Sequence, residues 1–366
     1  MLNNKPTIYF STYDDIKNPH YGGGGAIAVH EIAKRLRNTF DVHVLSWDYN
    51  GKKEERIDGI LYERFGSAFF SPKVGMFLYQ LGLPFIAKQK AFDLWIESFC
   101  PPFTTALLPL FIKKPVVGVV HMLAAEDMER KYKLPFHIVQ NYGLRQYQHL
   151  IATTTSIKAK VHAITKRSQI TVISNGITKV FHPTNAKEKY LLYLGRIEVD
   201  QKGIDLLINA FKQFAAKYPE YRLVIAGSGD KNEMEKMKQL ISDSSLTNKI
   251  LLKGKVSGKK KEELFRHAAC VVIPSRFETF ALVALEAMAY GAPVACFDID
   301  GLSWVPKNAA RKANAFDSNS LAKEISIVVS QKAVSDTLKK EGNRYAKQYT
   351  WDALAKNYET YLKTLL

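Results

Sequence analysis

Short apolar runs alternate with amphipathic helical segments along the first half of the chain. Thr7–Thr12 and Asp41–Ser46 have the apolar, β-branched character of buried strands, and Ala26–Leu36 between them has helical periodicity. Two further apolar runs, Leu94–Glu97 and Val116–His121, follow in the same half. Because buried strands that alternate with helices form parallel βαβ units, the pattern predicts an α/β domain with a parallel sheet.

The second half of the chain starts the same alternation again. Its expected strands are Tyr190–Leu194, Arg222–Ala226, Ile250–Lys253, Cys270–Ile273 and Pro293–Phe297. Its expected helices are Gly203–Tyr218, Lys231–Ser242, Lys259–His267 and Ala281–Tyr290, the last one stopped by Gly291. We therefore place one Rossmann-like domain at residues 1–180 and a second at 181–347. The segment 348–366, with the helix Trp351–Leu366, is expected to cross back to the first domain.

The composition fits a folded chain of two domains. With 366 residues, 46% of them hydrophobic and 24% charged, the chain exceeds the usual size of a single core. Met1–Pro6 lacks the apolar core of a signal peptide, and no run reaches the ~18 apolar residues of a membrane span. Cys100, Cys270 and Cys296 lie far apart in apolar surroundings, which favours buried free thiols and a cytoplasmic location.

The chain carries a formal net charge of +17 at pH 7. Nucleic acid, an anionic membrane surface and phosphorylated small molecules are the partners that such a charge favours, and solubility alone is the alternative. The lysines do not form one stripe with interleaved aromatic residues, which argues against nucleic acid. The net charge alone does not distinguish a membrane surface from phosphorylated small molecules, so the sequence motifs are needed to identify the partner.

A cationic loop in the second half has the composition of an anion site. Gly195-Arg196 ends a predicted strand, and Lys202-Gly203 opens the next predicted helix. Two cations, glycine backbone and a helix N-terminus together favour a diphosphate. Taken alone, an arginine and a lysine in such a loop would also fit a solvated surface.

Two glutamates mark a second polar position in the same half. Glu278 belongs to the segment Pro274–Phe280, directly after a predicted strand, where open α/β sheets place ligands. Glu286 is the only ionisable group of the apolar helix ALVALEAMAY, and a carboxylate there is costly without a partner. Carboxylates accept paired hydrogen bonds from sugar hydroxyls, although an internal salt bridge is the alternative for Glu286.

Together these motifs resemble the retaining glycosyltransferases with the GT-B fold, of the group 1 type (family 4), which include bacterial mannosyltransferases and sucrose-phosphate synthase. The resemblance covers roughly residues 190–301 in order and spacing. It rests on Gly195-Arg196 with Lys202-Gly203, Ala226–Gly229, Pro274-Ser275 with Glu278, Glu286–Ala289 and Gly291–Val294. It implies an α/β GT-B architecture, in which two Rossmann-like doubly wound domains face each other across a cleft. Asn175-Gly176 is similar to the family's domain junction.

The resemblance also implies a role for each matching residue of the second domain. Arg196 and Lys202 would bind the donor diphosphate, and Glu286 would hold the ribose. Glu278 would position the transferred sugar without acting as a base. Further donor contacts are implied for Gly227, for Lys255 and Val256 at the base, and for the backbone amides of Phe280, Ala281 and Leu282. Many family members have glycine where Ala281 stands, so its methyl group would either narrow the sugar pocket or shift the backbone.

The first half matches the family through a glycine loop and a histidine. Gly22–Gly25 lies between the first strand and helix and allows close backbone approach to phosphate, with a surface loop as the alternative. Gly24 and Gly25 are the donor contacts that we expect there. His121 is expected to be catalytic through a hydrogen bond to the donor sugar, against the alternative of a packed histidine. Glu126 and Asp127 are weaker candidates.

Asp298-Ile299-Asp300 has the form of the D-x-D triplet that binds metal in the other major glycosyltransferase fold. It follows the predicted strand Pro293–Phe297, so we interpret it as a polar loop and predict no metal site. Arg196 and Lys202 would offset the charge of the leaving group instead. We expect no cofactor beyond the nucleotide sugar, and the resemblance implies that the sugar keeps its anomeric configuration.

The segment Phe69–Lys90 is rich in aromatic residues and contains several lysines. It fits a helix on a membrane surface beside a lipid acceptor and, equally, a core helix interrupted at Pro84. Further basic residues would attract anionic lipid or simply solvate their faces: Lys158, Lys160, Lys166, Arg167 and the run Lys259–Lys261.

The sequence thus predicts a cytoplasmic enzyme that moves a hexose from a nucleotide-diphosphate sugar to an acceptor hydroxyl. The expected acceptor is a glycan or a lipid-linked glycan, in surface polysaccharide or glycolipid synthesis, with the enzyme peripheral to the inner face of the membrane. Two alternatives stay open. One is a nucleotide-sugar epimerase or hydrolase of the same fold, and the other is a non-catalytic basic protein that binds membrane or nucleic acid.

Overall fold

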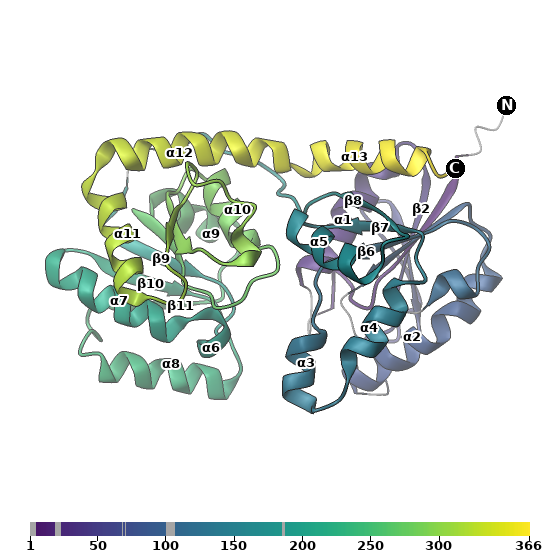
Figure 1. Cartoon of the computed structure of the whole chain (residues 1–366), viewed down its shortest axis with the longest axis horizontal. Coiled ribbons are helices and arrows are strands. Elements are labelled where there is room, and N and C mark those ends of the chain that lie inside the picture. Colours follow the sequence, from purple (N-terminus) through teal and green to yellow (C-terminus); the bar gives the residue numbers. More distant parts are fainter. Residues whose placement is uncertain (1–4, 19–22, 68, 70, 100–106, 185–186) are drawn as a thin grey trace. The chain divides into compact units, whose positions relative to one another are not determined.

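The computed structural model describes residues 5–18, 23–67, 69, 71–99, 107–184 and 187–366. The chain forms two compact α/β units (Figure 1). The first unit comprises Met1–Asn175 together with Trp351–Leu366, and the second comprises Gly176–Thr350. The division at Asn175 falls slightly earlier in the chain than the boundary after residue 180 that the alternation of strands and helices suggests.

The first unit has an eight-stranded sheet among its described residues, in the order β3-β4-β2-β1-β5-β6-β7-β8. Its strands are β1 (Thr7–Ser11), β2 (Asp41–Trp47), β3 (Glu54–Ile57), β4 (Ile60–Phe65), β5 (Leu94–Phe99), β6 (Val116–Val120), β7 (His149–Ala152) and β8 (Gln169–Val172). Neighbouring strands are parallel except for the hairpin β3–β4. That hairpin turns at Asp58 and Gly59, both at positive φ.

Helices cover both faces of this sheet. α1 (Gly24–Leu36) and α13 (Trp351–Lys363) share a core with one face. α2 (Pro72–Gln89), α4 (Phe136–Leu144) and α5 (Thr155–Ile164) pack on the other face. α3 (Ala125–Tyr132) and the short 3₁₀ segment η1 (Leu108–Leu110) complete the described helices of this unit. With helices on both sides, all five residues of β6 are buried, as parallel strands require.

The last helix belongs to the core of the first unit although it follows the second unit in the sequence. Trp351, Leu354 and Leu362 of α13 are at most 4% exposed and join the apolar cluster around α1. Arg35 of α1 donates a hydrogen bond of 2.5 Å to Asp352. The chain therefore completes its first core only with its final residues.

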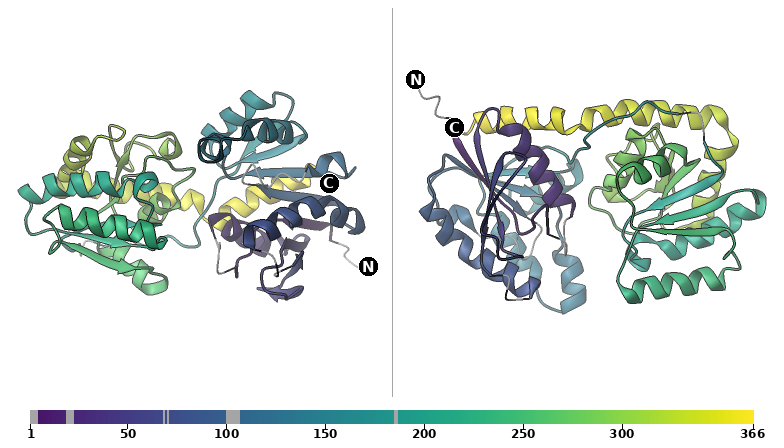
Figure 2. Two further views of the ribbon diagram at one scale, coloured as in Figure 1. Left: turned by 90° about the horizontal axis from the view of Figure 1, so that it is seen from below. Right: turned by 180° about the vertical axis from the view of Figure 1, so that it is seen from behind.

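The described residues of the second unit form a six-stranded parallel sheet in the order β11-β10-β9-β12-β13-β14. Its strands are β9 (Tyr190–Leu194), β10 (Arg222–Ala226), β11 (Ile250–Gly254), β12 (Cys270–Ile273), β13 (Val294–Phe297) and β14 (Arg311–Ala313). Its helices are α6 (Val199–Lys202), α7 (Ile204–Lys217), α8 (Lys231–Asp243), α9 (Gly258–His267), α10 (Leu282–Ala289), α11 (Ser318–Ser330) and α12 (Lys332–Ala346), with η2 (Asp300–Leu302) and η3 (Lys347–Tyr349). α7, α8 and α11 line one face, and α9 and α10 the other (Figure 2).

Two features of the second half differ from the sequence pattern. The helix predicted from Gly203 is preceded by the separate short helix α6, which ends at Lys202. Gly203 lies at φ +63, and a Cβ there would come within 2.0 Å of the Pro274 carbonyl oxygen, so the chain has to turn at a glycine. The pattern also gave no sign of the pair α11 and α12, or of the β3–β4 hairpin in the first unit.

Cys270 and Cys296 are buried free thiols, as expected, while Cys100 lies outside the described residues. Burial raises the pKa of the Cys296 thiol to about 12. Within the described parts of the chain, no helix has the length and apolar character needed to cross a membrane.

Candidate functional site

A cavity of about 150 Å³ lies at the carboxyl edge of the sheet in the second unit. This edge is where open parallel sheets bind ligands, because loops diverge from the strand ends there. Five residues predicted as donor contacts line the cavity: Arg196, Lys202, Glu278, Ala281 and Leu282. The structure thus brings together residues that are up to 86 positions apart in the sequence.

Lys202 and Glu278 form an almost buried ion pair beside this cavity. The Lys202 Nζ atom lies 2.8 Å from the Glu278 Oε1 atom, and the two side chains are 13% and 10% exposed. The Ser275 hydroxyl donates to the same carboxylate oxygen at 2.7 Å. Removing one partner of a buried pair typically costs about 3–5 kcal/mol, so each charge holds the other in place.

Arg196 is bound far less firmly. Its side chain is 67% exposed, and its Nη1 atom lies 2.8 Å from the Glu198 Oε1 atom. An exposed ion pair of this kind contributes about 0–1 kcal/mol, so the guanidinium can turn to another anion at small cost.

Gly227 supports the backbone that carries Arg196. A Cβ on Gly227 would lie 1.8 Å from the Gly195 carbonyl oxygen, so only glycine fits against this strand end. The Gly227 amide donates to the Gly254 carbonyl at 2.8 Å, which ties the turn to β11. Gly227 therefore packs directly behind the loop of the predicted anion site.

Arg276 links the two loops that form the cavity. Its guanidinium donates two hydrogen bonds to the Asp205 carboxylate, at 2.8 and 2.6 Å, and a third to the Asp200 carbonyl at 2.7 Å. The hydrogen bonds to Asp205 raise the pKa of Arg276, so it stays charged. Bidentate pairing fixes orientation as well as distance, and it anchors the loop of Glu278 to the helices that flank Lys202.

Ala281 occupies an unusual backbone position. It precedes α10 in the left-handed region, at φ +54, where an L-residue other than glycine is strained by about 1–2 kcal/mol. The preceding Phe280 ring stacks on Trp304 with centroids 4.6 Å apart, and the Trp304 indole N–H donates to the Phe280 carbonyl at 2.7 Å. Gly301 packs so closely that a Cβ there would lie 1.9 Å from the Glu278 carbonyl oxygen. These contacts hold the segment before α10 in its strained form.

Glu286 lies one helical turn beyond Leu282, on the same side of α10. Its carboxylate is 2.5 Å from the Lys261 Nζ atom of α9, and both side chains are 27% exposed. The internal salt bridge that the sequence left open is therefore present. Glu286 does not line the 150 Å³ cavity itself.

Lys255 and Val256 do not line that cavity either. Lys255 is exposed, and Val256 borders a separate hollow of about 840 Å³ along β10, β11 and α9. Lys255 and Val256 were predicted to contact the base of the nucleotide, but they do not line the cavity that contains Lys202 and Glu278.

The first unit places a histidine beside its glycine loop. A Cβ on Gly25 would lie 3.9 Å from the His121 ring, and the His121 Nε2 atom is 2.9 Å from the Ser98 hydroxyl. The His121 Nδ1 atom is buried without a hydrogen-bond partner among the described residues. Burial lowers the pKa of His121 to about 4, so the ring is neutral near pH 7. Gly24 begins α1 next to Gly25, and Gly22 lies outside the described residues.

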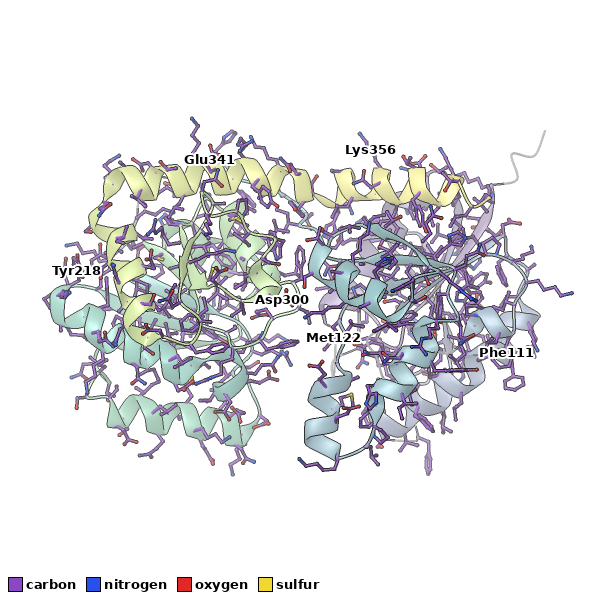
Figure 3. All side chains as sticks on the ribbon, viewed as in Figure 1. Phe111, Met122, Tyr218, Asp300, Glu341 and Lys356 are labelled. Carbon is purple, nitrogen blue, oxygen red and sulfur yellow. The ribbon has the colours of Figure 1, made fainter. Side chains whose placement is uncertain are left out.

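The remaining candidates are weaker. Glu126 is exposed at the start of α3, and the Asp127 side chain lies outside the described part of the chain. Asp298 is paired with Lys312 at 3.3 Å, and Asp300 opens η2 (Figure 3). Among the described residues, no three histidine, cysteine or acidic side chains are grouped so that they could hold a metal ion.

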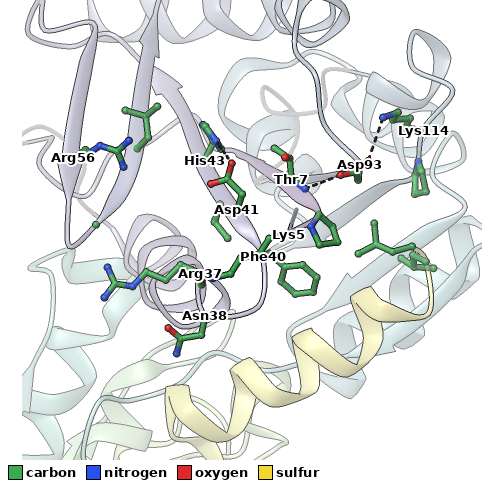
Figure 4. A pocket seen from close by; sticks show the side chains of 17 residues that line it. Lys5, Thr7, Arg37, Asn38, Phe40, Asp41, His43, Arg56, Asp93 and Lys114 are labelled. Carbon is green, nitrogen blue, oxygen red and sulfur yellow. Dashed lines mark hydrogen bonds and ion pairs between the residues drawn. The ribbon is translucent and has the colours of Figure 1, made fainter. Parts of the chain in front are cut away.

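A larger hollow, of about 1100 Å³, lies in the first unit at the edge of the sheet where the strands begin (Figure 4). Thr7 and Asp41 open β1 and β2 there, whereas His121 follows the end of β6. The Asp93 carboxylate in this hollow accepts a hydrogen bond from the Thr7 amide at 2.8 Å. Because the hollow borders the amino ends of the strands, it has no part in the predicted site.

Sequence reasoning missed several supporting residues. Arg276 stands inside the quoted motif Pro274–Phe280, but its partner Asp205 is 71 positions away and gave no signal. Asp14 was also missed: it is buried, and its carboxylate accepts a hydrogen bond of 3.0 Å from the Gly23 amide. The available signal for Asp14 was an acidic residue soon after the first predicted strand. Its carboxylate holds the amide of Gly23, the residue before α1.

Comparison with known families identifies both halves of the chain. Residues 176–349 match the family described as "Glycosyl transferases group 1", and residues 22–179 match "Glycosyltransferase Family 4". An uncharacterized glycosyltransferase of Methanocaldococcus jannaschii is 26% identical, over 92% of this chain and 93% of its own length.

Solved structures share the fold over the whole chain. Sucrose-phosphate synthase from Thermosynechococcus elongatus has a TM-score of 0.84, with 21% identity and 99% coverage of both chains. The Anabaena protein HepE, solved in complex with UDP-glucose, has a TM-score of 0.77, with 17% identity and coverage of 98% of this chain and all of its own. Both similarities extend across the two units, which confirms the predicted fold class of two parallel-sheet α/β domains.

Proposed function

The chain belongs to the group 1 glycosyltransferases and has the GT-B fold, and from this premise we propose that it moves a hexose from a nucleotide-diphosphate sugar to an acceptor hydroxyl. The observation that carries the proposal is the cavity where Arg196, Lys202 and Glu278 meet the start of α10. Cations and a helix N-terminus suit a diphosphate, and a carboxylate beside them suits sugar hydroxyls.

Donor binding would exchange partners within this cavity. The diphosphate would take Lys202 from Glu278, and it would take Arg196 from its weak surface pair with Glu198. Glu278 would then be free to accept hydrogen bonds from the sugar, while Ser275 keeps its carboxylate oriented. In this proposal the ion pair keeps Lys202 close to the diphosphate position and Glu278 close to the sugar position before the donor binds.

The nucleoside end of the donor would lie toward Glu286. Its carboxylate would accept hydrogen bonds from the ribose hydroxyls, with Lys261 fixing its orientation. UDP and UDP-glucose are the first donors to test, because the Anabaena relative was solved with them.

We propose a retaining reaction without a metal ion. The acceptor oxygen would bond to the anomeric carbon on the face from which the phosphate oxygen leaves, and the acceptor proton would pass to that phosphate oxygen. Arg196 and Lys202 would stabilise the charge on the departing diphosphate. His121, neutral near pH 7, would act by hydrogen bonding to the donor sugar and not by transferring a proton.

For the acceptor we propose a glycan or a lipid-linked glycan, in surface polysaccharide or glycolipid synthesis. The protein would then work in the cytoplasm at the inner face of the membrane. The charge of +17 supports an anionic setting of this kind.

The test is titration of the full chain with UDP, GDP and ADP in the presence of EDTA, followed by calorimetry. One nucleotide diphosphate should bind, and Arg196→Ala should weaken it by about ten-fold or more, since a charge-assisted contact is lost. Lys231→Ala is the matched control, because Lys231 is 89% exposed on α8 of the same unit. Equal affinity of Arg196→Ala and the parent chain would refute the anion site.

A product assay then separates transfer from the other reactions of nucleotide sugars. With the matching nucleotide hexose, the product should depend on an added acceptor and keep the anomeric configuration. Conversion of the donor without any acceptor would instead indicate an epimerase or a hydrolase.

A further inference from the structure

α2 and α4 expose apolar side chains on their outer surfaces. Phe77, Leu81 and Phe85 of α2 are 47%, 56% and 65% exposed. Ile138, Val139 and Tyr142 of α4 are 59%, 54% and 53% exposed. Exposed apolar groups gathered on neighbouring helices mark an interaction surface more often than chance. We refer to these six side chains as the α2–α4 face.

The two helices lie on the same face of the first sheet. Tyr79 and Leu83 of α2 share one core with Leu144 of α4, and Figure 1 shows both helices on the side of the sheet away from α13. The buried Glu97 carboxylate of β5 accepts a hydrogen bond from Gln80 of α2 and another from Tyr147, just after α4. The inner sides of both helices are thus fixed, and the exposed apolar side chains lie on their outer sides.

The two stretches of sequence that contain α2 and α4 are basic and free of acidic residues. No aspartate or glutamate occurs between Glu63 and Asp93, the stretch that contains α2. None occurs between Glu129 and Glu188 either, and these 58 residues hold ten lysines and arginines. The chain has 35 acidic residues in all. α3 packs against α4 and carries acidic residues, among them Glu126 and Glu129, and Glu129 pairs with His137 of α4, so basic residues outnumber acidic ones around this face.

Exposed cations border the apolar side chains. Lys88, in the last turn of α2, places its ammonium 5.3 Å from the ring centroid of Phe111, which is labelled in Figure 3. Lys133 precedes α4 and Arg145 follows it, and Lys158 is exposed on α5, which packs on the same side of the sheet. Apolar residues edged by basic residues are typical of surfaces that bind anionic bilayers.

We propose that the α2–α4 face docks on a bilayer surface that contains anionic phospholipid. Phe77, Leu81 and Phe85 enter the boundary between headgroups and acyl chains with Ile138 and its neighbours on α4, and the bordering cations contact the headgroups. A second copy of this chain is a poorer occupant, because it would oppose two faces on which basic residues outnumber acidic ones. The inference does not depend on sugar transfer, since it uses no residue of the donor cavity.

The experiment is co-sedimentation of the full chain with vesicles of phosphatidylcholine alone and of phosphatidylcholine mixed with phosphatidylglycerol. The chain should bind the mixed vesicles, bind neutral vesicles weakly, and dissociate as salt rises. The variant Leu81→Gln with Phe85→Gln should bind about ten-fold less, because two inserted apolar side chains are lost. Thermal unfolding of each variant shows that the fold is kept.

Two further variants separate the apolar and the charged parts. Lys88→Glu with Lys158→Glu should weaken binding to mixed vesicles and flatten its dependence on salt. Leu252→Gln is the matched control, because Leu252 is a 41% exposed apolar residue of β11 in the second unit, and it should bind like the parent chain.

Failure to bind mixed vesicles, or equal binding by the parent chain and both double variants, would overturn the proposal. Self-association of the parent chain in sedimentation velocity that Leu81→Gln with Phe85→Gln abolishes, without any vesicle binding, would assign the face to a second copy instead. Because none of these measurements contains a nucleotide, they leave the test of the donor site separate.

Discussion

At the residue scale, the proposed donor site consists of the cavity beside Lys202 together with Glu286 of α10, and its charged side chains already have partners. Lys202 is neutralised by Glu278 and Glu286 by Lys261, so the charges are compensated before any donor enters. A buried cation or carboxylate without a partner would be costly, and a ligand can gain access only by replacing these partners. Ligand binding at this site is therefore a competition between ion pairs, and it should weaken as salt rises.

Replacing Ala281 by glycine should stabilise the protein. Ala281 is held at φ +54, where glycine is unstrained, and the relief of about 1–2 kcal/mol is offset in part by the greater entropy of glycine in the unfolded chain. We expect a net gain of about 0.5–1 kcal/mol in the free energy of unfolding of the second unit, measured by urea denaturation. Ala287→Gly, inside α10, is the control and should destabilise the chain, because glycine is a poor helix former.

His121 should make the stability of the chain depend on pH. Its pKa is about 4 in the folded state and lies well below the ordinary value for an unfolded chain, about 6.5. As the pH falls from 6.5 toward 4, the unfolded state takes up a proton that the folded state does not, so stability is lost in that window. Urea denaturation should show a steeper loss for the parent chain than for His121→Asn, by at most about 1.4 kcal/mol per pH unit.

The exposed His162 of α5 provides the matched control for this measurement. His162→Asn should keep the pH dependence of the parent chain. If His121→Asn also kept it, the buried, neutral state of His121 would be wrong.

At the scale of elements, the cavity depends on how the loop after β12 is held against α6 and α7. The Arg276 amide donates to the Gln201 carbonyl at 3.0 Å, while its side chain grips Asp205. Gly203 leaves room for Pro274 at the same junction. These contacts fix the loop that carries Glu278 to the segment that carries Lys202.

Arg276→Lys should weaken nucleotide binding by about three- to ten-fold although the charge is kept. Lysine cannot reproduce the bidentate contact with Asp205, so the loop of Glu278 loses its register with Lys202. Calorimetric titration measures this loss, and thermal unfolding should change little because the pair is partly exposed. Arg222→Lys, at the exposed start of β10, is the control. Unchanged affinity in Arg276→Lys would mean that the pair does not position the site.

At the scale of the whole molecule, the chain folds its first unit from two distant segments. α13 supplies Trp351, Leu354 and Leu362 to a core whose other members lie before residue 176. Burying one large apolar side chain contributes about 1.5–3 kcal/mol, so the helix contributes an amount comparable with the total stability of a domain, about 5–15 kcal/mol. The first unit therefore cannot be complete until the last residues are made.

Truncation after Thr350 should unfold the first unit and leave the second folded. Calorimetric scanning of the truncated chain should show one cooperative transition where the full chain shows contributions from both units. Nucleotide binding should survive, because the residues of the donor cavity all lie within Gly176–Thr350. Loss of both transitions would show that the second unit depends on the first.

The places where lysine and arginine gather in the structure explain part of the net charge of +17. The first unit has no acidic residue between Glu63 and Asp93, the stretch that contains α2, and the second unit places Arg196 and Lys202 at its cavity. The net charge adds up all charged residues of the chain. Function depends instead on where residues of one charge lie together on the surface.

The amino-acid sequence determined the elements and the general location of the site. Alternating apolar and amphipathic segments predicted β10 and β12 to the residue, because such periodicity depends only on near neighbours. The same pattern placed Arg196 and Glu278 after strands, and parallel sheets bring strand ends to one edge. The hairpin β3–β4 escaped prediction. Its first strand, β3, has only four residues and three of them are charged, so it carries no strand pattern.

Only the tertiary structure decided which groups are partners. Lys202 lies 76 positions from Glu278, and Lys261 lies 25 positions from Glu286, so no local pattern could reveal either pair. The left-handed backbone of Ala281 and the separation of Val256 from the donor cavity likewise depend on loops packed from distant segments. The apolar exterior of α2 and α4 was equally undecided, because a sequence pattern shows that a side chain is apolar and only packing shows whether anything covers it.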